Sequence, residues 1–205
     1  MATEGRDFEA LVLAAGAGSR FGGGKLLAPW RGGLVLHGAL AAAFAAPIRG
    51  VTVVWGADRR VPDAVRAWAD AHGQAGRLRL AEAGRHAEGL SASLKAGLAA
   101  LPADSAGVSV LGVFVFLGDM PRIPAEVLQP LAAAVLAGAP AAAPIFEGRR
   151  GHPALLGRRL FAEVSDLEGD RGAGQLLDRL GSAVAGLPAP DDGVLYDIDR
   201  PEDLV

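Results

Sequence analysis

Leu13-Ala-Ala-Gly-Ala-Gly-Ser-Arg-Phe-Gly-Gly-Gly-Lys25 is the stretch that decides the fold. It starts inside a short apolar run, Ala10–Ala15, which ends in glycines as a buried parallel strand does. Its five glycines let the backbone adopt positive φ and approach a ligand closely. Two cations, Arg20 and Lys25, flank those glycines, and we expect a helix to follow. Successive N–H groups in such a loop form an anion-binding concavity, so the stretch predicts a phosphate site.

Two common nucleotide-binding motifs do not fit this loop. The dinucleotide fingerprint G-x-G-x-x-G begins at Gly16, but Phe21 stands at its third glycine position, which argues against a dinucleotide oxidoreductase. The Walker A pattern fails because Ser19 replaces its first glycine and Leu26 replaces its hydroxyl residue. The remaining alternative is a glycine-rich connection with solvated cations. The coincidence of strand, glycines and two cations favours the phosphate site.

Composition narrows the class of protein. The 205 residues suit one domain (1–205), and 51% apolar residues allow a large core. The net charge of −3, with no basic stripe, gives no sign of a nucleic-acid surface or a polybasic membrane anchor. The chain has no cysteine, which excludes disulfides, thiolate catalysis and cysteine-bound metals. Because Met1–Glu9 is polar and resembles neither a signal peptide nor a spanning helix, we expect a cytoplasmic location.

Strand and helix patterns alternate along the chain, which predicts an α/β fold with a mostly parallel sheet in three α/β/α layers. The expected strands are Ala10–Ala15, Val51–Trp55, Leu78–Ala81 and Val110–Leu117, and the expected helices are Leu34–Ala46, Pro62–Ala71, Leu90–Leu101 and Pro124–Ala137. After Gly138 we expect strands at Ala141–Ile145, Ala154–Leu156 and Gly193–Ile198, with helices at Leu160–Val164 and Ala173–Leu180. Residues after about 140 should form a small β-containing lobe beside the sheet, within the same domain.

Two aspartates follow predicted strands. Asp119 follows the apolar run Val113–Leu117 after a single glycine, and ligands of open α/β sheets bind outside such strand ends. A carboxylate next to a phosphate loop repels the phosphates unless a cation lies between them, and Mg²⁺ is the usual one. Asp199 is a second candidate ligand and also a candidate N-cap for a helix that starts at Pro201. The structural alternative for Asp119 is a cap on the turn before Pro121.

Six motifs follow one another over nearly the whole chain. They are Leu13–Lys25, Gly89-Leu-Ser-Ala-Ser-Leu-Lys-Ala-Gly97, Leu117-Gly-Asp119-Met-Pro, Gly148-Arg-Arg-Gly-His-Pro153, Gly169-Asp-Arg-Gly-Ala173 and Asp197-Ile-Asp199-x-Pro201-Glu-Asp203. In this order they resemble the MobA-like NTP transferases, most closely the molybdenum cofactor cytidylyltransferases. The resemblance implies a Rossmann-like nucleotidyltransferase fold. It also implies Mg²⁺-dependent transfer of a nucleotidyl group from an NTP to a phosphomonoester, with release of pyrophosphate.

The resemblance implies roles for single residues as well. The expected catalytic residues are Arg20, Lys25 and Asp119, and the expected Mg²⁺ ligands are Asp119 and Asp199. The expected nucleotide-binding residues are Leu13, Ala14, Ala15, Gly16, Gly18, Arg20, Lys25, Gly89, Ser91, Ser93 and Asp119. The expected acceptor-binding residues, in or near the lobe after residue 140, are Gly151, His152, Pro153 and Asp170.

The same resemblance suggests the substrates. The form Ala14-Ala15-Gly16 resembles the CTP-using branch, so we expect CTP as the nucleotide, molybdopterin as the acceptor and a molybdenum hydroxylase as a candidate recipient. Gly174 stands where the family often has Arg, which puts one acceptor or phosphate contact in question. Two alternatives stay open: a cytidylyl- or uridylyltransferase for a sugar or polyol phosphate, and a molybdenum cofactor carrier without chemistry. A carrier, however, needs no metal beside a triphosphate loop.

The four histidines show no metal-ligand spacing. His37 and His72 fall on predicted helices and are interpreted as surface or packing residues. His86 precedes the Gly89 motif and is a weaker candidate for a nucleotide contact. His152 has local hydrogen bonding as its alternative role, and Asp170 has a helix cap as its alternative.

Overall fold

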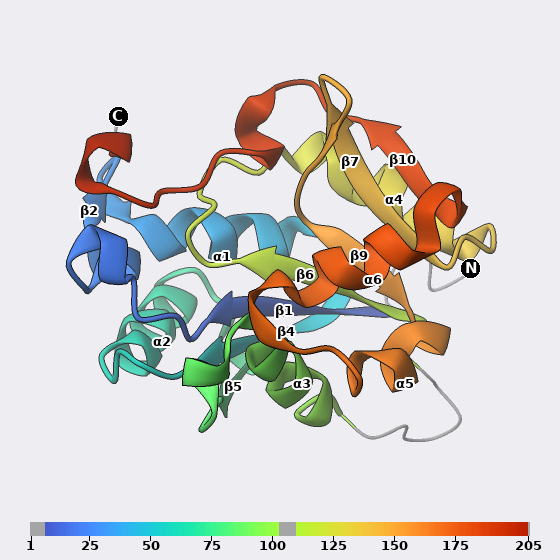
Figure 1. Cartoon of the computed structure of the whole chain (residues 1–205). Coiled ribbons are helices and arrows are strands. Elements are labelled where there is room, and N and C mark those ends of the chain that lie inside the picture. Colours follow the sequence, from blue (N-terminus) through green and yellow to red (C-terminus); the bar gives the residue numbers. More distant parts are fainter. Residues whose placement is uncertain (1–6, 103–109, 205) are drawn as a thin grey trace.

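The computed structural model describes residues 7–102 and 110–204, and its apolar runs form the strands of one central sheet (Figure 1). The fully buried strand β1 (Phe8–Ala14) lies between β4 (Ile48–Trp55) and β6 (Gly112–Leu117), parallel to both. Strand β5 (Leu78–Glu82) adds to β4, again in parallel. The carboxyl ends of these four parallel strands (β1, β4, β5 and β6) therefore lie at one edge of the sheet, where the glycine loop begins.

The chain after residue 140 continues the same sheet. Its strands are β7 (Ala141–Phe146), β8 (Arg149–Arg150), β9 (Ala154–Gly157) and β10 (Val184–Pro188). Strand β9 runs antiparallel between β6 and β7, β10 is parallel to β7, and β8 pairs with β7. The order is β10-β7-β9-β6-β1-β4-β5, so the predicted C-terminal β-containing part is an extension of the sheet.

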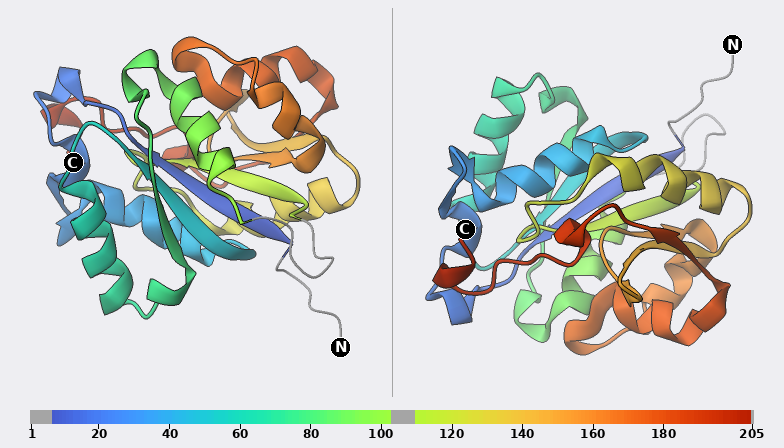
Figure 2. Two further views of the ribbon diagram at one scale, coloured as in Figure 1. Left: turned by 90° about the horizontal axis from the view of Figure 1, so that it is seen from below. Right: turned by 90° about the horizontal axis from the view of Figure 1, so that it is seen from above.

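Helices cover both faces of the sheet (Figure 2). One face carries α1 (Val35–Ala45), α2 (Val61–Ala71) and α4 (Leu128–Leu136), and the other carries α3 (Leu90–Ala99), α5 (Phe161–Val164) and α6 (Gly172–Leu180). Alternate residues of β1 serve the two faces: Val12 belongs to the first core cluster, and Leu11 and Leu13 belong to the second. The predicted three-layer α/β fold is confirmed.

The predicted last strand, Gly193–Ile198, is wrong. Residues Asp192–Val194 form a 3₁₀ turn, because the Asp191 carboxylate accepts a hydrogen bond from the N–H of Gly193 at 2.8 Å. The N–H of Ile198 then donates to the carbonyl of Asp119 at 3.0 Å and not to a neighbouring strand. The last strand is β10, which the sequence analysis did not predict.

The helix predicted at Leu34–Ala46 is present as α1, but the glycine loop is joined to it by further short elements. Two 3₁₀ turns, η1 (Ser19–Phe21) and η2 (Lys25–Leu27), are followed by a short hairpin of β2 (Pro29–Trp30) and β3 (Gly33–Leu34) before α1 begins. The C-terminal segment returns to this region and ends beside β2 (Figure 1). Across residues 7–102 and 110–204, no helix has the length and apolar character needed to cross a membrane.

Candidate active site

The glycine loop is curled by its own backbone. Gly18, Gly22, Gly23 and Gly24 all have positive φ, between 60° and 94°, which only glycine adopts at little cost. The N–H groups of Phe21 and Gly23 both donate to the carbonyl of Gly18, at 3.0 and 3.1 Å. The loop thus folds back on itself immediately after β1.

Ahead of this curl, three successive amides remain available. The N–H groups of Gly16, Ala17 and Gly18 donate no hydrogen bond to any residue of the described ranges. All three residues line a cavity of about 630 Å³ at the carboxyl ends of β1 and β6. Free amides facing a cavity are what an oxyanion such as a phosphate requires.

This cavity contains most of the residues that the sequence singled out. Those in its lining are Leu13, Ala14, Ala15, Gly16, Gly18, Arg20, Lys25, Gly89, Ser93, Asp119, Asp170 and Asp199. They come from the glycine loop, the N-terminus of α3, the end of β6, the turn before α6 and the C-terminal segment. Residues far apart in the sequence therefore meet in one place.

A charge cluster forms one wall of the cavity. Nζ of Lys25 lies 2.7 Å from Oδ2 of Asp119 and 3.0 Å from Oδ1 of Asp199. Nη1 of Arg20 lies 2.9 Å from Oδ2 of the same Asp199. The Lys25 side chain is only 11% exposed, whereas that of Arg20 is 74% exposed, so Lys25 is the fixed centre of the cluster.

Backbone contacts explain why Asp199 reaches this wall. The hydrogen bond from the N–H of Ile198 to the carbonyl of Asp119 ties the two aspartate segments together. Asp203 then accepts from the N–H groups of Asp199 and Arg200, at 2.9 and 2.8 Å. The predicted N-cap role of Asp199 is therefore wrong: the last turn is capped through Asp203, which leaves the Asp199 carboxylate free for Lys25 and Arg20.

The ion pairs shift the protonation of the cluster. Burial acts to lower the pKa of Lys25, but the hydrogen bonds and charges of Asp119 and Asp199 outweigh it and raise that pKa above its ordinary value. The hydrogen bond from Lys25, followed by its charge and by the contacts of Arg20, holds the pKa of Asp199 below its ordinary value. Lys25 is thus firmly cationic and Asp199 firmly anionic at neutral pH.

The two carboxylates are suited to a divalent cation. An oxygen of Asp119 and an oxygen of Asp199 lie within 3.0 Å of one positively charged atom, which shows that both can face a single cation. Oxygen ligands are those that Mg²⁺ and Mn²⁺ prefer. In the described part of the chain, no group of three or more His, Cys, Asp or Glu side chains could hold a metal ion. A metal here would need phosphate oxygens or water to complete its coordination.

Some predicted residues lie elsewhere. Ser93 lines the cavity beside the glycine loop, whereas Ser91 lines a separate cavity. Side chains two positions apart on a helix point in different directions. Gly151 and His152 line a third, small cavity of about 170 Å³, where Gly174 and Asp178 also lie, and burial lowers the pKa of His152. Pro153 follows a cis peptide bond and is buried.

Asp170 belongs to the main cavity and not to a helix cap. Helix α6 starts after Arg171 and has no side-chain cap hydrogen bond. Asp170 instead lies against Gly89, where a Cβ would come within 2.4 Å of its Oδ1. The predicted acceptor residues are thus divided: Asp170 faces the charge cluster's cavity, whereas Gly151 and His152 face the small one.

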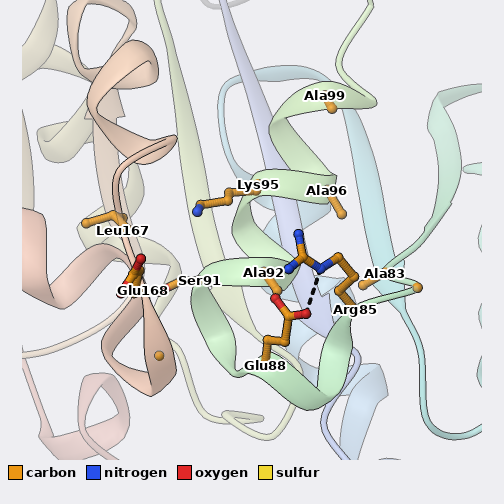
Figure 3. A pocket seen from close by; sticks show the side chains of 12 residues that line it. Ala83, Arg85, Glu88, Ser91, Ala92, Lys95, Ala96, Ala99, Leu167 and Glu168 are labelled. Carbon is orange, nitrogen blue, oxygen red and sulfur yellow. Dashed lines mark hydrogen bonds and ion pairs between the residues drawn. The ribbon is translucent and has the colours of Figure 1, made fainter.

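The separate cavity that contains Ser91 has a volume of about 700 Å³ and lies over the outer side of α3 (Figure 3). Four of its twelve lining residues are alanines, and Lys95 on α3 has Glu168 across from it (Figure 3). Nε of Arg85 lies 2.6 Å from Oε1 of Glu88, so this cation already has an anion (Figure 3). This cavity lacks the free loop amides and the paired carboxylates, so the cavity beside the glycine loop is the candidate active site.

Two charged residues near the glycine loop, Arg60 and Asp197, were given no role from the sequence. Nη2 of Arg60 lies 3.1 Å from the position of a Cβ on Gly24, and Arg60 is held there by Asp58 through bonds of 2.9 and 2.7 Å. Asp197 is the second: desolvation, together with the negative charges of Asp119 and Asp199, raises its pKa. Only the tertiary arrangement brings Arg60 to the loop.

A family model for the MobA-like NTP transferase domain matches residues 10–184. The chain belongs to the MobA-like NTP transferase family. As a MobA-like NTP transferase it is a nucleotidyltransferase, and its glycine loop and both motif regions around Gly89 and Asp119 fall within the matched range. No curated protein matches the chain.

Solved structures share this fold over nearly the whole MobA-like NTP transferase chain. An Rv0371c homologue from Mycobacterium sp. strain JC1 is 26% identical with a TM-score of 0.77, covering 97% of this chain and 93% of that one. Rv0371c of Mycobacterium tuberculosis H37Rv, in a complex with manganese, is 25% identical with a TM-score of 0.71, covering 96% and 95%. Molybdopterin-guanine dinucleotide biosynthesis protein A from Archaeoglobus fulgidus is 20% identical with a TM-score of 0.66, covering 96% and 94%.

Proposed function

We propose that this MobA-like NTP transferase transfers CMP from CTP to the phosphate of molybdopterin and releases pyrophosphate, with Mg²⁺ as its metal. One observation carries the reaction type: Lys25 stands between Asp119 and Asp199 beside three free loop amides. The choice of CTP rests on Ala14-Ala15-Gly16, and the choice of molybdopterin rests on the motif order along the sequence. The likeness to a molybdopterin-guanine dinucleotide biosynthesis protein is consistent with that acceptor.

The proposed reaction needs no general base. The acceptor phosphate is already anionic near neutral pH, so its oxygen attacks the α-phosphorus directly while the bond from that phosphorus to the β-phosphate oxygen breaks. The amides of Gly16, Ala17 and Gly18 bind the phosphates, and Lys25 and Arg20 neutralise the pyrophosphate as it leaves. Catalysis is then positioning together with charge stabilisation.

Asp119 and Asp199 are the residues that would hold the metal. Bound there, Mg²⁺ would neutralise negative charge between the carboxylates and the phosphate oxygens. The manganese in the Rv0371c structure belongs to that protein, and it supports testing Mn²⁺ alongside Mg²⁺ here. Asp119 and Asp199 also pair with the side chains of Lys25 and Arg20 when no nucleotide is bound.

The test is pyrophosphate release by the purified protein with CTP, UTP, GTP or ATP, Mg²⁺ and molybdopterin. We expect release with CTP and a product whose mass equals molybdopterin plus one cytidylyl group. Asp119→Asn is the matched inactive control. Release only with a sugar or polyol phosphate as acceptor would replace molybdopterin. Tight pterin binding without pyrophosphate release would point to a carrier, and a product formed only from GTP would overturn the choice of nucleotide.

A further inference from the structure

His86 lines the proposed nucleotide cavity and lies outside the glycine loop. It starts the 3₁₀ turn η4 (His86–Glu88), between β5 and α3. The cavity's cations and free amides belong to the glycine loop, and they are the natural partners of the triphosphate. The uncharged part of the lining, which includes His86, Ala87, Leu90 and Ser93, is therefore left for the base and ribose.

The tautomer of the neutral His86 ring follows from its neighbours. Its Nδ1 lies 3.0 Å from the carbonyl oxygen of Ala83, and a carbonyl can only accept, so Nδ1 carries the proton. In the neutral ring, Nε2 is then a hydrogen-bond acceptor. Nε2 makes no hydrogen bond within residues 7–102 and 110–204.

The ring is also held in place. A Cβ at Gly56 would lie 2.8–2.9 Å from Cγ, Cβ and Nδ1 of His86, so the ring packs directly on the backbone of Gly56. The N–H of His86 donates to the carbonyl of Ala83 as well, at 3.0 Å. A half-buried ring with one edge fixed presents a single acceptor at its other edge.

We infer that Nε2 of His86 accepts a hydrogen bond from the exocyclic amine of cytosine and thereby selects CTP over UTP. Cytosine has an amine donor at position 4, where uracil has a carbonyl acceptor. Facing Nε2, that carbonyl would leave two acceptors opposed and both unpaired, which costs more than one lost hydrogen bond. The inference rests on the proposed function in one respect: it takes the cavity as the nucleotide site.

Binding of CTP and UTP, each with Mg²⁺ and without acceptor, tests this by calorimetry. We expect the wild-type protein to bind CTP more tightly, and the ratio of the two dissociation constants to fall about tenfold in His86→Leu. His86→Gln keeps a polar side chain whose amide can offer either an acceptor or a donor, so it should bind both nucleotides with little preference.

His72→Gln is the matched control. Its ring also places Nδ1 near a backbone carbonyl, that of Trp68 at 2.7 Å, but His72 lies at the end of α2 and does not line the cavity. We expect its CTP-to-UTP ratio to equal that of the wild type. A change as large as that of His86→Leu would show that the assay reports general damage and not recognition.

Three outcomes would overturn the inference. They are a wild-type protein that does not discriminate CTP from UTP, an equal loss of affinity for both nucleotides in the two His86 variants, and wild-type affinity for both nucleotides in those variants. An equal loss would place His86 on the shared ribose. If CTP still binds and reacts while the ratio is unchanged, the proposed function survives without this role for His86. If no nucleotide binds at all, both fail.

Discussion

Lys25 lies between Asp119 and Asp199, the two proposed metal ligands. Its Nζ is 2.7 Å from Oδ2 of Asp119 and 3.0 Å from Oδ1 of Asp199, in a setting where the lysine side chain is 11% exposed. Without nucleotide, the protein's own cation thus neutralises the candidate metal ligands. A metal alone must compete with Lys25, whereas a metal that arrives with a triphosphate brings the lysine a new partner.

Replacing Lys25 should therefore make metal binding easier while it impairs catalysis. In Lys25→Met the two carboxylates lose their cation, so we expect a lower melting temperature in chelator and a larger rise on adding Mg²⁺ than in the wild type. Each 1 kcal/mol of added binding free energy should raise the melting temperature by roughly 2–4 °C. Lys95→Met, in the cavity over α3, is the control and should respond to Mg²⁺ like the wild type. Equal Mg²⁺ responses in both variants would contradict the competition.

Asp119→Asn should abolish most of the activity and leave the fold intact. The substitution preserves shape but removes the charge that faces Lys25 and would face the proposed metal, and we expect turnover at saturating nucleotide to fall about 10²–10³-fold. The measurement is pyrophosphate release, with circular dichroism as the check on folding. Asp63→Asn, which removes an exposed partner of Arg66 on α2, should keep full activity. Wild-type turnover in Asp119→Asn would remove this residue from the reaction.

Gly89→Ala tests the wall where α3 meets the turn before α6. Gly89 has a φ of 101°, and a Cβ there would lie 2.4 Å from Oδ1 of Asp170 and 2.7 Å from Gly169. The variant should lose about 1–3 kcal/mol of unfolding free energy and weaken nucleotide binding. Gly84→Ala is the control, because a Cβ at Gly84 meets nothing within 4 Å. The measurements are denaturant unfolding and nucleotide titration of both variants. Equal stability and equal nucleotide affinity in the two variants would contradict the close packing of Gly89 against Asp170 and Gly169.

The ion pairs of Asp199 should make stability depend on pH in the acid range. Lys25, and then Arg20, hold the pKa of Asp199 below its ordinary 3.8, so the unfolded state takes up the proton more readily. The resulting stabilisation is complete above about pH 4 and is lost as the pH falls through the lower, folded-state pKa. The difference in unfolding free energy between the wild type and Asp199→Asn should therefore be constant from pH 5 to 7 and shrink below pH 4. A difference that stays constant down to pH 3 would show that Asp199 keeps no lowered pKa.

Local patterns were enough to predict the central sheet. The apolar runs at Phe8–Ala14 and Gly112–Leu117 are largely buried and are soon followed by glycine or aspartate, so the apolar pattern and the turn residues both identify them. The edge strand Val184–Pro188 was missed because it is short, half-exposed and ends in proline. The last strand was predicted at Gly193–Ile198 instead, where the turn at Asp191 prevents pairing with the sheet.

The site was predictable only in part, for similar reasons. The glycine loop and Asp119 follow strands that point to one edge, and the structure brings them together with Asp199. Helix geometry alone argues against Ser91 and Ser93 facing one cavity, since they are two residues apart. The positions of Arg60 and of the His86 ring are set by contacts with Gly24 and Gly56, and no local sequence pattern predicts those contacts.

The bond between Arg20 and Asp199 spans 179 positions of the chain. A nascent polypeptide on the ribosome that has emerged only as far as α6 would already have its glycine loop, β1 and Asp119, but not Asp199. Such a chain could bind phosphate through its loop amides, but it would lack one of the two proposed metal ligands. Nucleotidyl transfer would then begin only when translation has delivered the C-terminal segment, and a short C-terminal truncation would be expected to switch off the chemistry of a molecule that is otherwise folded.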